Sequence, residues 1–301
     1  MNTHDTLIVT GSTGFIGSHL IPALKNLGYR LILPVRSIPV TPPDTQTVYW
    51  KITDDWENFD DLLQQTSPCG VIHLATRFLP AHSPENIPEI IKANIEFGTR
   101  ILESATKANI PWFINTGTFW QHFDGADYDP VNLYAATKQA FEVIARYYQN
   151  ISPIKFVTLC LNDTYGPGDT RKKLFALWKK LSKTPDNRMQ MSKGEQLLDI
   201  LYIDDVINGI CHLMKMLTDD SLPERNTRFY LTSDRLLSLQ QAAETFAKVS
   251  GKKLNICWGA RPYRQREVMH PKCSGIKLPG WHPAVTLEEG IKKFLAEDDN
   301  E

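Results

Sequence analysis

Short apolar runs alternate in the first half of the chain with longer segments in which apolar residues recur every three or four positions. The runs predict buried strands, and the longer segments predict amphipathic helices. The expected strands are 7–10, 30–35, 48–50, 70–75, 112–115 and 155–161, and the expected helices are 18–27, 56–65, 87–108 and 132–148. Strands that alternate with helices in this way predict an α/β fold with a doubly wound parallel Rossmann sheet.

The pattern changes after the sixth strand, where a Gly-Pro-Gly turn at 165–169 leaves the sheet. The further expected elements are helices 172–181, 204–217, 238–250 and 287–295 and strands 200–203, 229–232 and 254–258. We therefore predict a nucleotide-binding Rossmann domain over 1–161, with 197–218 packed back on it. Residues 162–301 should form mainly a smaller α/β substrate lobe, built from about 162–196 and 219–285.

Three glycines stand between the first strand and the first helix. Gly11, Gly14 and Gly17 are spaced G-x-x-G-x-x-G, in the strand–turn–helix context of a dinucleotide site. Gly11 would allow the tight turn, Gly14 the close approach of the backbone to a pyrophosphate, and Gly17 the packing of helix on strand. The helix start would offer N–H groups and a positive dipole end to phosphates.

Ligands of doubly wound sheets bind at the carboxyl ends of the strands. Arg36, Thr76, Thr116 and Thr118 follow or end predicted strands there. NAD-binding sheets carry an acidic residue after the second strand, to accept from the ribose 2′-hydroxyl. Arg36 stands there instead and can pair with a 2′-phosphate. This predicts NADP(H) as the cofactor, the alternative being a solvated surface arginine.

Tyr134 and Lys138 lie four residues apart on one predicted helix, so their side chains share a face. A neighbouring ammonium favours the phenolate and should lower the pKa of the tyrosine. Such a tyrosine can give a proton to an alkoxide or take one from an alcohol while a hydride moves. Thr116 would hold the substrate oxygen, and Thr118 is the alternative hydroxyl.

Composition excludes several other function classes. The 301 residues carry a net charge of −1, with Lys and Arg spread along the chain, so there is no electrostatic footprint for nucleic acid. No apolar run is long enough for a membrane span, and no leader pattern precedes the first strand. Five widely spaced cysteines without C-x-x-C pairs suit a reducing cytoplasm and argue against disulfides and structural zinc. We expect a cytoplasmic protein without a bound metal.

Several motifs together resemble one known family, the nucleotide-sugar branch of the extended short-chain dehydrogenases/reductases. The matching segments are 10–17, 72–75, 94–99, the Tyr134/Lys138 pair, 165–169, 202–206, 278–283 and 287–291. The resemblance implies a catalytic triad of Thr116, Tyr134 and Lys138. It also implies that the cofactor contacts Gly11, Thr13, Gly14, Phe15, Ile16, Gly17, Arg36, Leu74, Ala75, Thr76, Asn94, Tyr134 and Lys138.

Departures from the family pattern narrow the expected reaction. Sugar-nucleotide dehydratases of this family carry an Asp-Glu pair after the catalytic threonine, where this chain has Gly117 and Thr118, so dehydration is disfavoured. The short Thr116–Tyr134 spacing, with Glu195-Gln196 and 264–269, is most similar to CDP-abequose and CDP-paratose synthases. The resemblance therefore implies NADPH-dependent reduction of the 4-keto group of a CDP-linked 4-keto-6-deoxy or 3,6-dideoxy hexose, in bacterial surface-polysaccharide synthesis.

Four residues are expected to bind the nucleotide-sugar substrate: Thr118, Asn162, Arg171 and Arg264. Two rival functions stay open. One is an epimerase with tightly held NAD, for which His122 would be a candidate second acid or base. The other is a non-catalytic NAD(P)-binding regulator. The resemblance is also compatible with a homodimer formed through two long helices.

Two features receive a structural interpretation rather than a catalytic one. His73, between apolar neighbours, is expected to be a core residue. Asp204 and Asp205 look like a metal pair, but the family resemblance implies that they start a structural helix, so helix capping is the better explanation.

Overall fold

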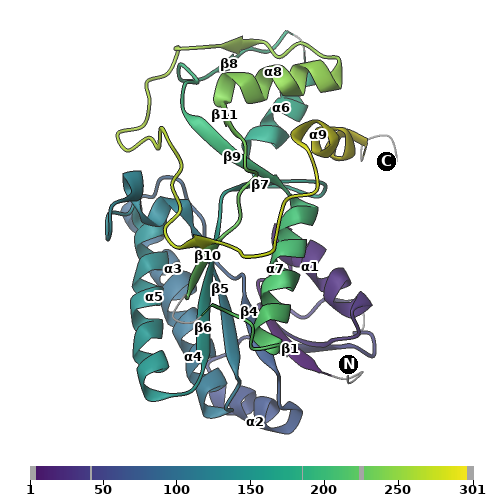
Figure 1. The fold of residues 1–301 in the computed structure, drawn as a ribbon, viewed down its shortest axis with the longest axis vertical. Helices are drawn as coiled ribbons and strands as arrows, with labels where there is room; N and C mark the ends of the chain where they lie inside the picture. The colour runs from purple at the N-terminus through teal and green to yellow at the C-terminus, as the bar shows by residue number, and fades with distance from the viewer. Residues whose placement is uncertain (1–4, 41–42, 185, 224–226, 297–301) are drawn as a thin grey trace.

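The large sheet of the computed structural model is wholly parallel and has eight strands (Figure 1). The structure describes residues 5–40, 43–184, 186–223 and 227–296. The strand order is β13-β10-β6-β5-β4-β1-β2-β3. Its strands are β1 Thr6–Thr10, β2 Arg30–Val35, β3 Thr47–Lys51, β4 Gly70–His73, β5 Trp112–Thr118, β6 Lys155–Leu161, β10 Arg228–Tyr230 and β13 Ile276–Lys277. The predicted doubly wound parallel sheet is confirmed.

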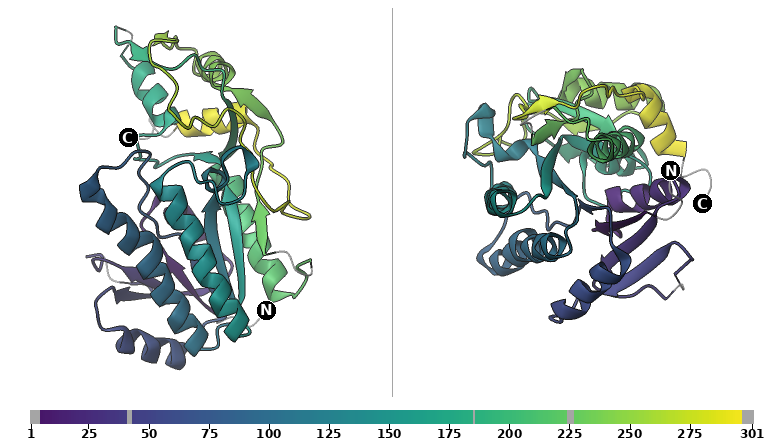
Figure 2. Two further views of the ribbon diagram at one scale, coloured as in Figure 1. Left: turned by 90° about the vertical axis from the view of Figure 1, so that its left-hand side faces the viewer. Right: turned by 60° about the horizontal axis from the view of Figure 1, so that its bottom comes forward.

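Helices cover both faces of this sheet. Successive side chains of a strand point to opposite faces, so neighbouring residues of one strand enter different apolar cores. Leu7 and Val9 belong to one apolar core, and Ile8 between them belongs to the other. The first core lies under α1 (Phe15–Asn26) and α7 (Ile203–Thr218). The second lies under α2 Trp56–Thr66, α4 Phe97–Lys107 and α5 Leu133–Ile151, of which α4 and α5 run side by side (Figure 2).

The helix predicted over 87–108 is interrupted by a π-helical turn. It consists of α3 (Ile87–Ile91), the π-helical residues Lys92–Glu96 and α4. Short 3₁₀ turns occupy Pro84–Asn86, Phe119–Gln121 and Phe123–Gly125. A π turn widens the backbone ring, and such turns occur frequently at functional sites. Asn94 lies in this one.

A smaller lobe lies beyond the carboxyl ends of the large sheet (Figure 1). It contains a three-stranded sheet ordered β11-β9-β7 and a two-stranded pair of β12 with β8. Its elements are β7 Asp163–Tyr165, α6 Leu174–Ser182, β8 Met189–Gln190, β9 Leu197–Tyr202, β11 Leu236–Ser238, α8 Leu239–Ser250, β12 Ile256–Cys257 and α9 Leu287–Ala296.

The structure divides the second half of the chain differently from the prediction. β10 pairs with β6, and β13 pairs with β10, so two segments expected in the smaller lobe extend the large sheet. β9, expected to pack back on the large sheet with α7, instead pairs with β7 and β11. Only α7 of that segment returns, against α1. These pairings join residues 37 to 70 positions apart, from Asp163 with Ile200 to Arg228 with Thr158. Hydrophobic periodicity carries no information on such partners.

Asp205 secures the crossover between the lobe and the large sheet. Its carboxylate is 1 % exposed and accepts hydrogen bonds from the backbone N–H groups of Ala284 (2.8 Å) and Val285 (3.1 Å). Asp204 pairs with Lys293 of α9. The capping interpretation of these two acids is therefore wrong: both fasten the chain around α9 to α7. Among the described residues, no helix is long and apolar enough to cross a membrane.

Candidate active site

The β1–α1 turn has the shape of a phosphate cradle. Gly11 has φ +70°, and a Cβ there would lie 2.7 Å from the backbone N of Ala75; a Cβ on Gly17 would lie 2.3 Å from the carbonyl O of Gly11. Gly14 is the N-cap of α1, no side chain caps the helix, and no acid lies in its first turn. The N–H groups and positive dipole of this end are thus free for an anion, and the residues fit a dinucleotide phosphate.

The end of β4 is held against this turn. The hydroxyl of Thr10 lies 2.8 Å from His73 Nδ1 and accepts from the N–H of Ala75 at 3.2 Å. Thr76 Oγ1 donates to Asn94 Oδ1 (3.0 Å), and Asn94 Nδ2 donates to Thr137 Oγ1 (2.9 Å). The Asn94 side chain, predicted to contact the cofactor, is therefore occupied in joining the β4 loop to α5.

Arg36 directly follows β2, the neighbour of β1 in the sheet. Its side chain is exposed, and within the described ranges it forms no ion pair. An unpaired guanidinium beside the glycine turn is free to meet a phosphate.

The two candidate threonine hydroxyls differ in what they contact. Both residues lie within β5, which runs three residues further than predicted. Thr116 is 7 % exposed and donates to the carbonyl O of His73 at 3.1 Å. Thr118 Oγ1 accepts from the N–H of Trp120 at 3.4 Å and caps the 3₁₀ turn that follows.

Tyr134 lies in the first turn of α5, which begins after the N-cap Asn132. Its ring meets the ring of Phe78 edge-on at 5.0 Å, and the hydroxyl of Thr76 lies beside its phenol. Burial raises the pKa of this phenol above its ordinary value, and Lys138 is not among the groups that shift it. The predicted lowering by Lys138 is therefore wrong for this structure, because burial sets the direction of the shift.

Lys138 is 2 % exposed, and burial lowers the pKa of its ammonium to about 8. The negative charge of Glu142 opposes that shift. His73 on β4 is 1 % exposed, and burial together with Lys138 lowers the pKa of its imidazole to about 3. The interpretation of His73 as a neutral core residue is confirmed.

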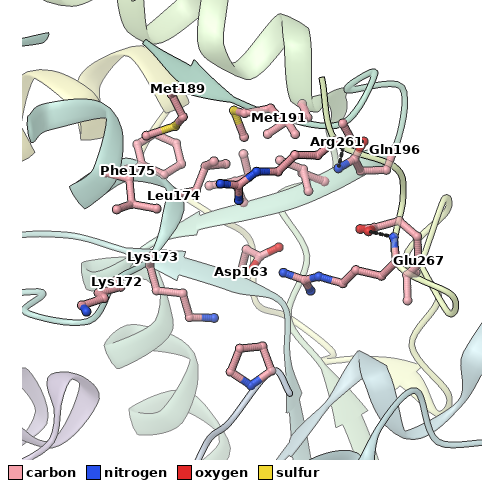
Figure 3. Close-up of a pocket in the computed structure, with 18 of the residues that line it drawn as sticks. Asp163, Lys172, Lys173, Leu174, Phe175, Met189, Met191, Gln196, Arg261 and Glu267 are labelled. Atoms are coloured by element: carbon pink, nitrogen blue, oxygen red, sulfur yellow. Dashed lines mark hydrogen bonds between the residues drawn. The ribbon is translucent and has the colours of Figure 1, made fainter. Parts of the chain in front are cut away.

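A cavity of about 1160 Å³ separates this part of the large sheet from the smaller lobe (Figure 3). Cations dominate its charged lining: Lys172, Lys173, Lys180, Arg188, Arg261, Arg264 and Arg266 against Asp163 and Glu267. Phe78, Phe119 and Trp120 form its aromatic wall. In Figure 3 the side chains of Lys173, Asp163 and Arg261 enter the cavity from three different segments. Such a space suits a ligand that is both anionic and partly aromatic.

Among the residues predicted to bind substrate, Arg264 lines this cavity, with its guanidinium carbon 5.9 Å from the Trp120 ring. Arg171 instead forks onto Asp169, through Nε at 2.7 Å and Nη2 at 2.8 Å. Asn162 donates to Asp199 (2.8 Å) and to the carbonyl of Leu231. Thr118, Asn162 and Arg171 are thus not among the lining residues.

Sequence reasoning missed Phe78, Trp120, Arg261 and Arg266. The only signal for Trp120 was its position directly after a strand that ends in the site. His122, the candidate second acid or base, is 8 % exposed and does not line the cavity. Its Nδ1 lies 3.2 Å from the carbonyl of Ala126, and burial lowers the pKa of its imidazole. Within the ranges that the structure describes, no three His, Cys, Asp or Glu side chains are arranged to hold a metal.

Comparison with known proteins agrees with this geometry. The model of the NAD dependent epimerase/dehydratase family matches residues 7–225. CDP-abequose synthase of Salmonella typhimurium is 28 % identical over 298 residues, covering 96 % of this chain and 97 % of the relative. The Yersinia pseudotuberculosis CDP-abequose synthase is 26 % identical, covering 88 % and 91 %. The crystal structure of Thermotoga maritima UDP-glucose 4-epimerase has a TM-score of 0.81 at 21 % identity, covering 98 % and 99 %.

Proposed function

From the premise that this chain belongs to the NAD-dependent epimerase/dehydratase family, we propose that it is an NADPH-dependent reductase of nucleotide-linked sugars. Its substrate would carry a 4-keto group on a 6-deoxy or 3,6-dideoxy hexose, linked to CDP. The synthases of two bacteria that match nearly the whole chain support this assignment.

The similarity to CDP-abequose synthases over nearly the whole chain is the observation that carries this proposal. Reduction of a ketone requires a proton donor for the oxygen, and the buried phenol of Tyr134, whose pKa burial raises, is in the protonated form that this step needs. A bound nicotinamide cofactor would supply the hydride. Tyr134 would give its proton to the carbonyl oxygen, Thr116 would orient that oxygen, and Lys138 would hold the nicotinamide ribose. The 11–17 turn would hold the pyrophosphate, and Arg36 the 2′-phosphate.

The basic cavity would bind the nucleotide diphosphate. Lys173 Nζ lies 4.4 Å from the centre of the Phe78 ring, next to Tyr134, and Arg264 faces the same aromatic wall. Both cations are held by rings rather than by carboxylates, so they can turn to a phosphate at little cost. Asn162 and Arg171 would first have to leave their present hydrogen bonds.

The direct test is NADPH oxidation with a CDP-linked 4-keto-3,6-dideoxyhexose, with the product identified by NMR. We expect stoichiometric NADPH use, and slower turnover with the matching UDP- and dTDP-sugars. An enzyme that retains NAD through purification and interconverts C4 epimers without net NADPH use would instead be an epimerase, the activity named for its structural relative. No turnover with any sugar, but intact cofactor binding, would favour a regulator.

We also propose a homodimer through α5. Val143, Tyr147 and Ile151 are 53 %, 59 % and 58 % exposed and recur every four residues, so they form one apolar stripe on that helix. Sedimentation of the wild type should give a dimer mass, and Tyr147→Glu should give a monomer.

A further inference from the structure

A buried ionic network lies one helical turn beyond Lys138 on α5. Glu142 pairs with Arg228 of β10, and each side chain is only 14 % exposed. Glu142 Oε1 also accepts from Gln121 Nε2 at 2.7 Å. The Nε and Nη2 groups of Arg228 find no hydrogen-bond partner among the residues that the structure describes. None of these three residues lines the cavity, and none is among the residues proposed above to touch the substrate or the cofactor.

Among the described residues, no carboxylate forms an ion pair with Lys138, although its side chain is buried. Its side chain is almost fully buried, and among the described residues no group accepts a hydrogen bond from its ammonium. Burial of an unpaired charge is costly, so the charged form survives only where another charge compensates it. Glu142, four residues along the same helix face, is the group that opposes the loss of the Lys138 proton.

The same carboxylate is fixed against the strand that carries Thr116. Gln121 Oε1 accepts from the N–H of Thr118 at 2.8 Å while its Nε2 donates to Glu142. A Cβ on Gly117 would lie 2.9 Å from Gln121 Oε1 and 3.6 Å from Glu142 Oε1. A glycine between the two threonines therefore leaves room for the network, and the position of Glu142 is set from β5 and β10 together.

We propose that Glu142 is a positioning residue that supplies the countercharge for the buried ammonium of Lys138, with Arg228 and Gln121 holding it in place. The role of Lys138 in turnover rests on the proposed function, but the charge interaction between Glu142 and Lys138 does not.

Several ionisable groups surround this pair on neighbouring elements. His73 of β4 faces Lys138 and stays neutral. His122, Cys160 of β6 and Cys273 lie near Arg228. Tyr134 precedes Lys138 on α5. Arg228 is therefore the one cation in this set that competes with Lys138 for Glu142, and its removal should act on Lys138 in the direction opposite to removal of Glu142.

The test measures the free energy of unfolding of the full chain without cofactor, from pH 6 to 10, each time relative to the matching Lys138→Met variant. The native pKa of Lys138 is below the unfolded value, so the cost of burying its charge is present at lower pH and is relieved as pH rises above about 8. In Glu142→Gln this rise should begin about one pH unit lower, the scale expected for one neighbouring charge in a partly buried site.

Arg228→Gln is the matched control, because it breaks the same ion pair from the other side. Its rise should begin at the wild-type pH or higher, and Glu142→Asp, which keeps the charge, should stay near the wild type even if Glu142→Gln does not fold. The proposal is overturned if both glutamine variants move the rise downward, if neither moves it, or if Glu142→Asp behaves like an uncharged variant. If the wild type does not reduce a 4-keto sugar, the proposed function is wrong. The pH dependence of the free energy of unfolding would still test the interaction of Glu142 with Lys138.

Discussion

The two sides of the site differ in how completely the protein satisfies its own polar groups. On the sheet side, Thr10 and Thr116 are each hydrogen-bonded to His73 of β4. Thr76 and Asn94 connect the loop after β4 to α5 through further hydrogen bonds. On the side of the smaller lobe, Lys173 and Arg264 face open space with aromatic rings as their neighbours. The polar groups of the sheet side are thus already bonded to one another, whereas the cations of the lobe side are available to bind a ligand.

This difference separates chemistry from recognition. Groups that move protons or hold a hydride donor must be placed to within a fraction of an ångström, and such placement needs side chains fixed by packing and hydrogen bonds. A diphosphate with a flexible linkage can be bound by mobile cations, since charge attraction tolerates displacement. Substitutions on the sheet side should therefore lower kcat, and substitutions on the lobe side should raise KM.

The largest effect is expected at Tyr134. Tyr134→Phe removes the proton donor but keeps the ring packed on Phe78, so turnover should fall by at least about 10²-fold, the usual scale for a general acid. NADPH binding, followed by fluorescence, should change little. Lys138→Met should impair both quantities. Near-normal turnover of Tyr134→Phe would remove this tyrosine from the mechanism and with it the catalytic role of the sheet side.

The second effect concerns cofactor choice at Arg36. Replacing Arg36 by Asp removes a charge-assisted contact to a 2′-phosphate and installs an acceptor for a ribose hydroxyl. Loss of a charged hydrogen bond worth about 1.5–3 kcal/mol should weaken NADPH roughly ten- to a hundredfold. NADH use should hold or improve. The measurement is kcat/KM for both cofactors, and a wild type that already prefers NADH would contradict the NADP assignment and favour the epimerase.

The better-predicted side is the sheet side, for a physical reason. Gly11, Gly14 and Gly17 fall within seven residues, and steric demand at Gly11 and Gly17 is visible in the sequence because only glycine fits such a turn. Tyr134 and Lys138 share one helix turn, so their proximity follows from spacing alone. Local rules were sufficient for these residues.

The lobe side depends on contacts that no local rule contains. The lobe strands β7, β8, β11 and β12 are two or three residues long, too short for a hydrophobic period to appear. Arg171 looked available until the structure showed its fork on Asp169. The roles of Glu142 and Arg228 were invisible for the same reason, because their partnership crosses 86 positions.

A comparison of Arg264 with Arg171 tests whether the lobe side binds the substrate without taking part in the chemistry. Arg264→Ala should raise the KM for the nucleotide sugar roughly tenfold with kcat nearly unchanged, as expected for one charged contact in a wet cavity. Arg171→Ala should change KM less than about twofold, because its guanidinium is already held by Asp169. Equal effects of the two substitutions, or a fall in kcat alone for Arg264→Ala, would show that the lobe side takes part in the chemistry.

The smallest effect on turnover is expected from the titration of His73. This titration tests the comparison of the two sides through the pH dependence of the free energy of unfolding. The native pKa of His73 is about 3, below the unfolded value of about 6.5. The unfolded chain thus takes up a proton that the native chain refuses as pH falls through this window. Stability should fall there, by at most about 1.4 kcal/mol per pH unit from this group.

His73→Gln should flatten that acid slope in urea titrations between pH 4 and 7, whatever it does to stability at neutral pH. His270→Gln, at an exposed position on the lobe side, is the matched control. An unchanged slope in His73→Gln would mean that water reaches the imidazole in the native state. The core around His73 would then be open to water, although its hydrogen bonds indicate that it is closed. The sheet side would then differ less from the lobe side than proposed.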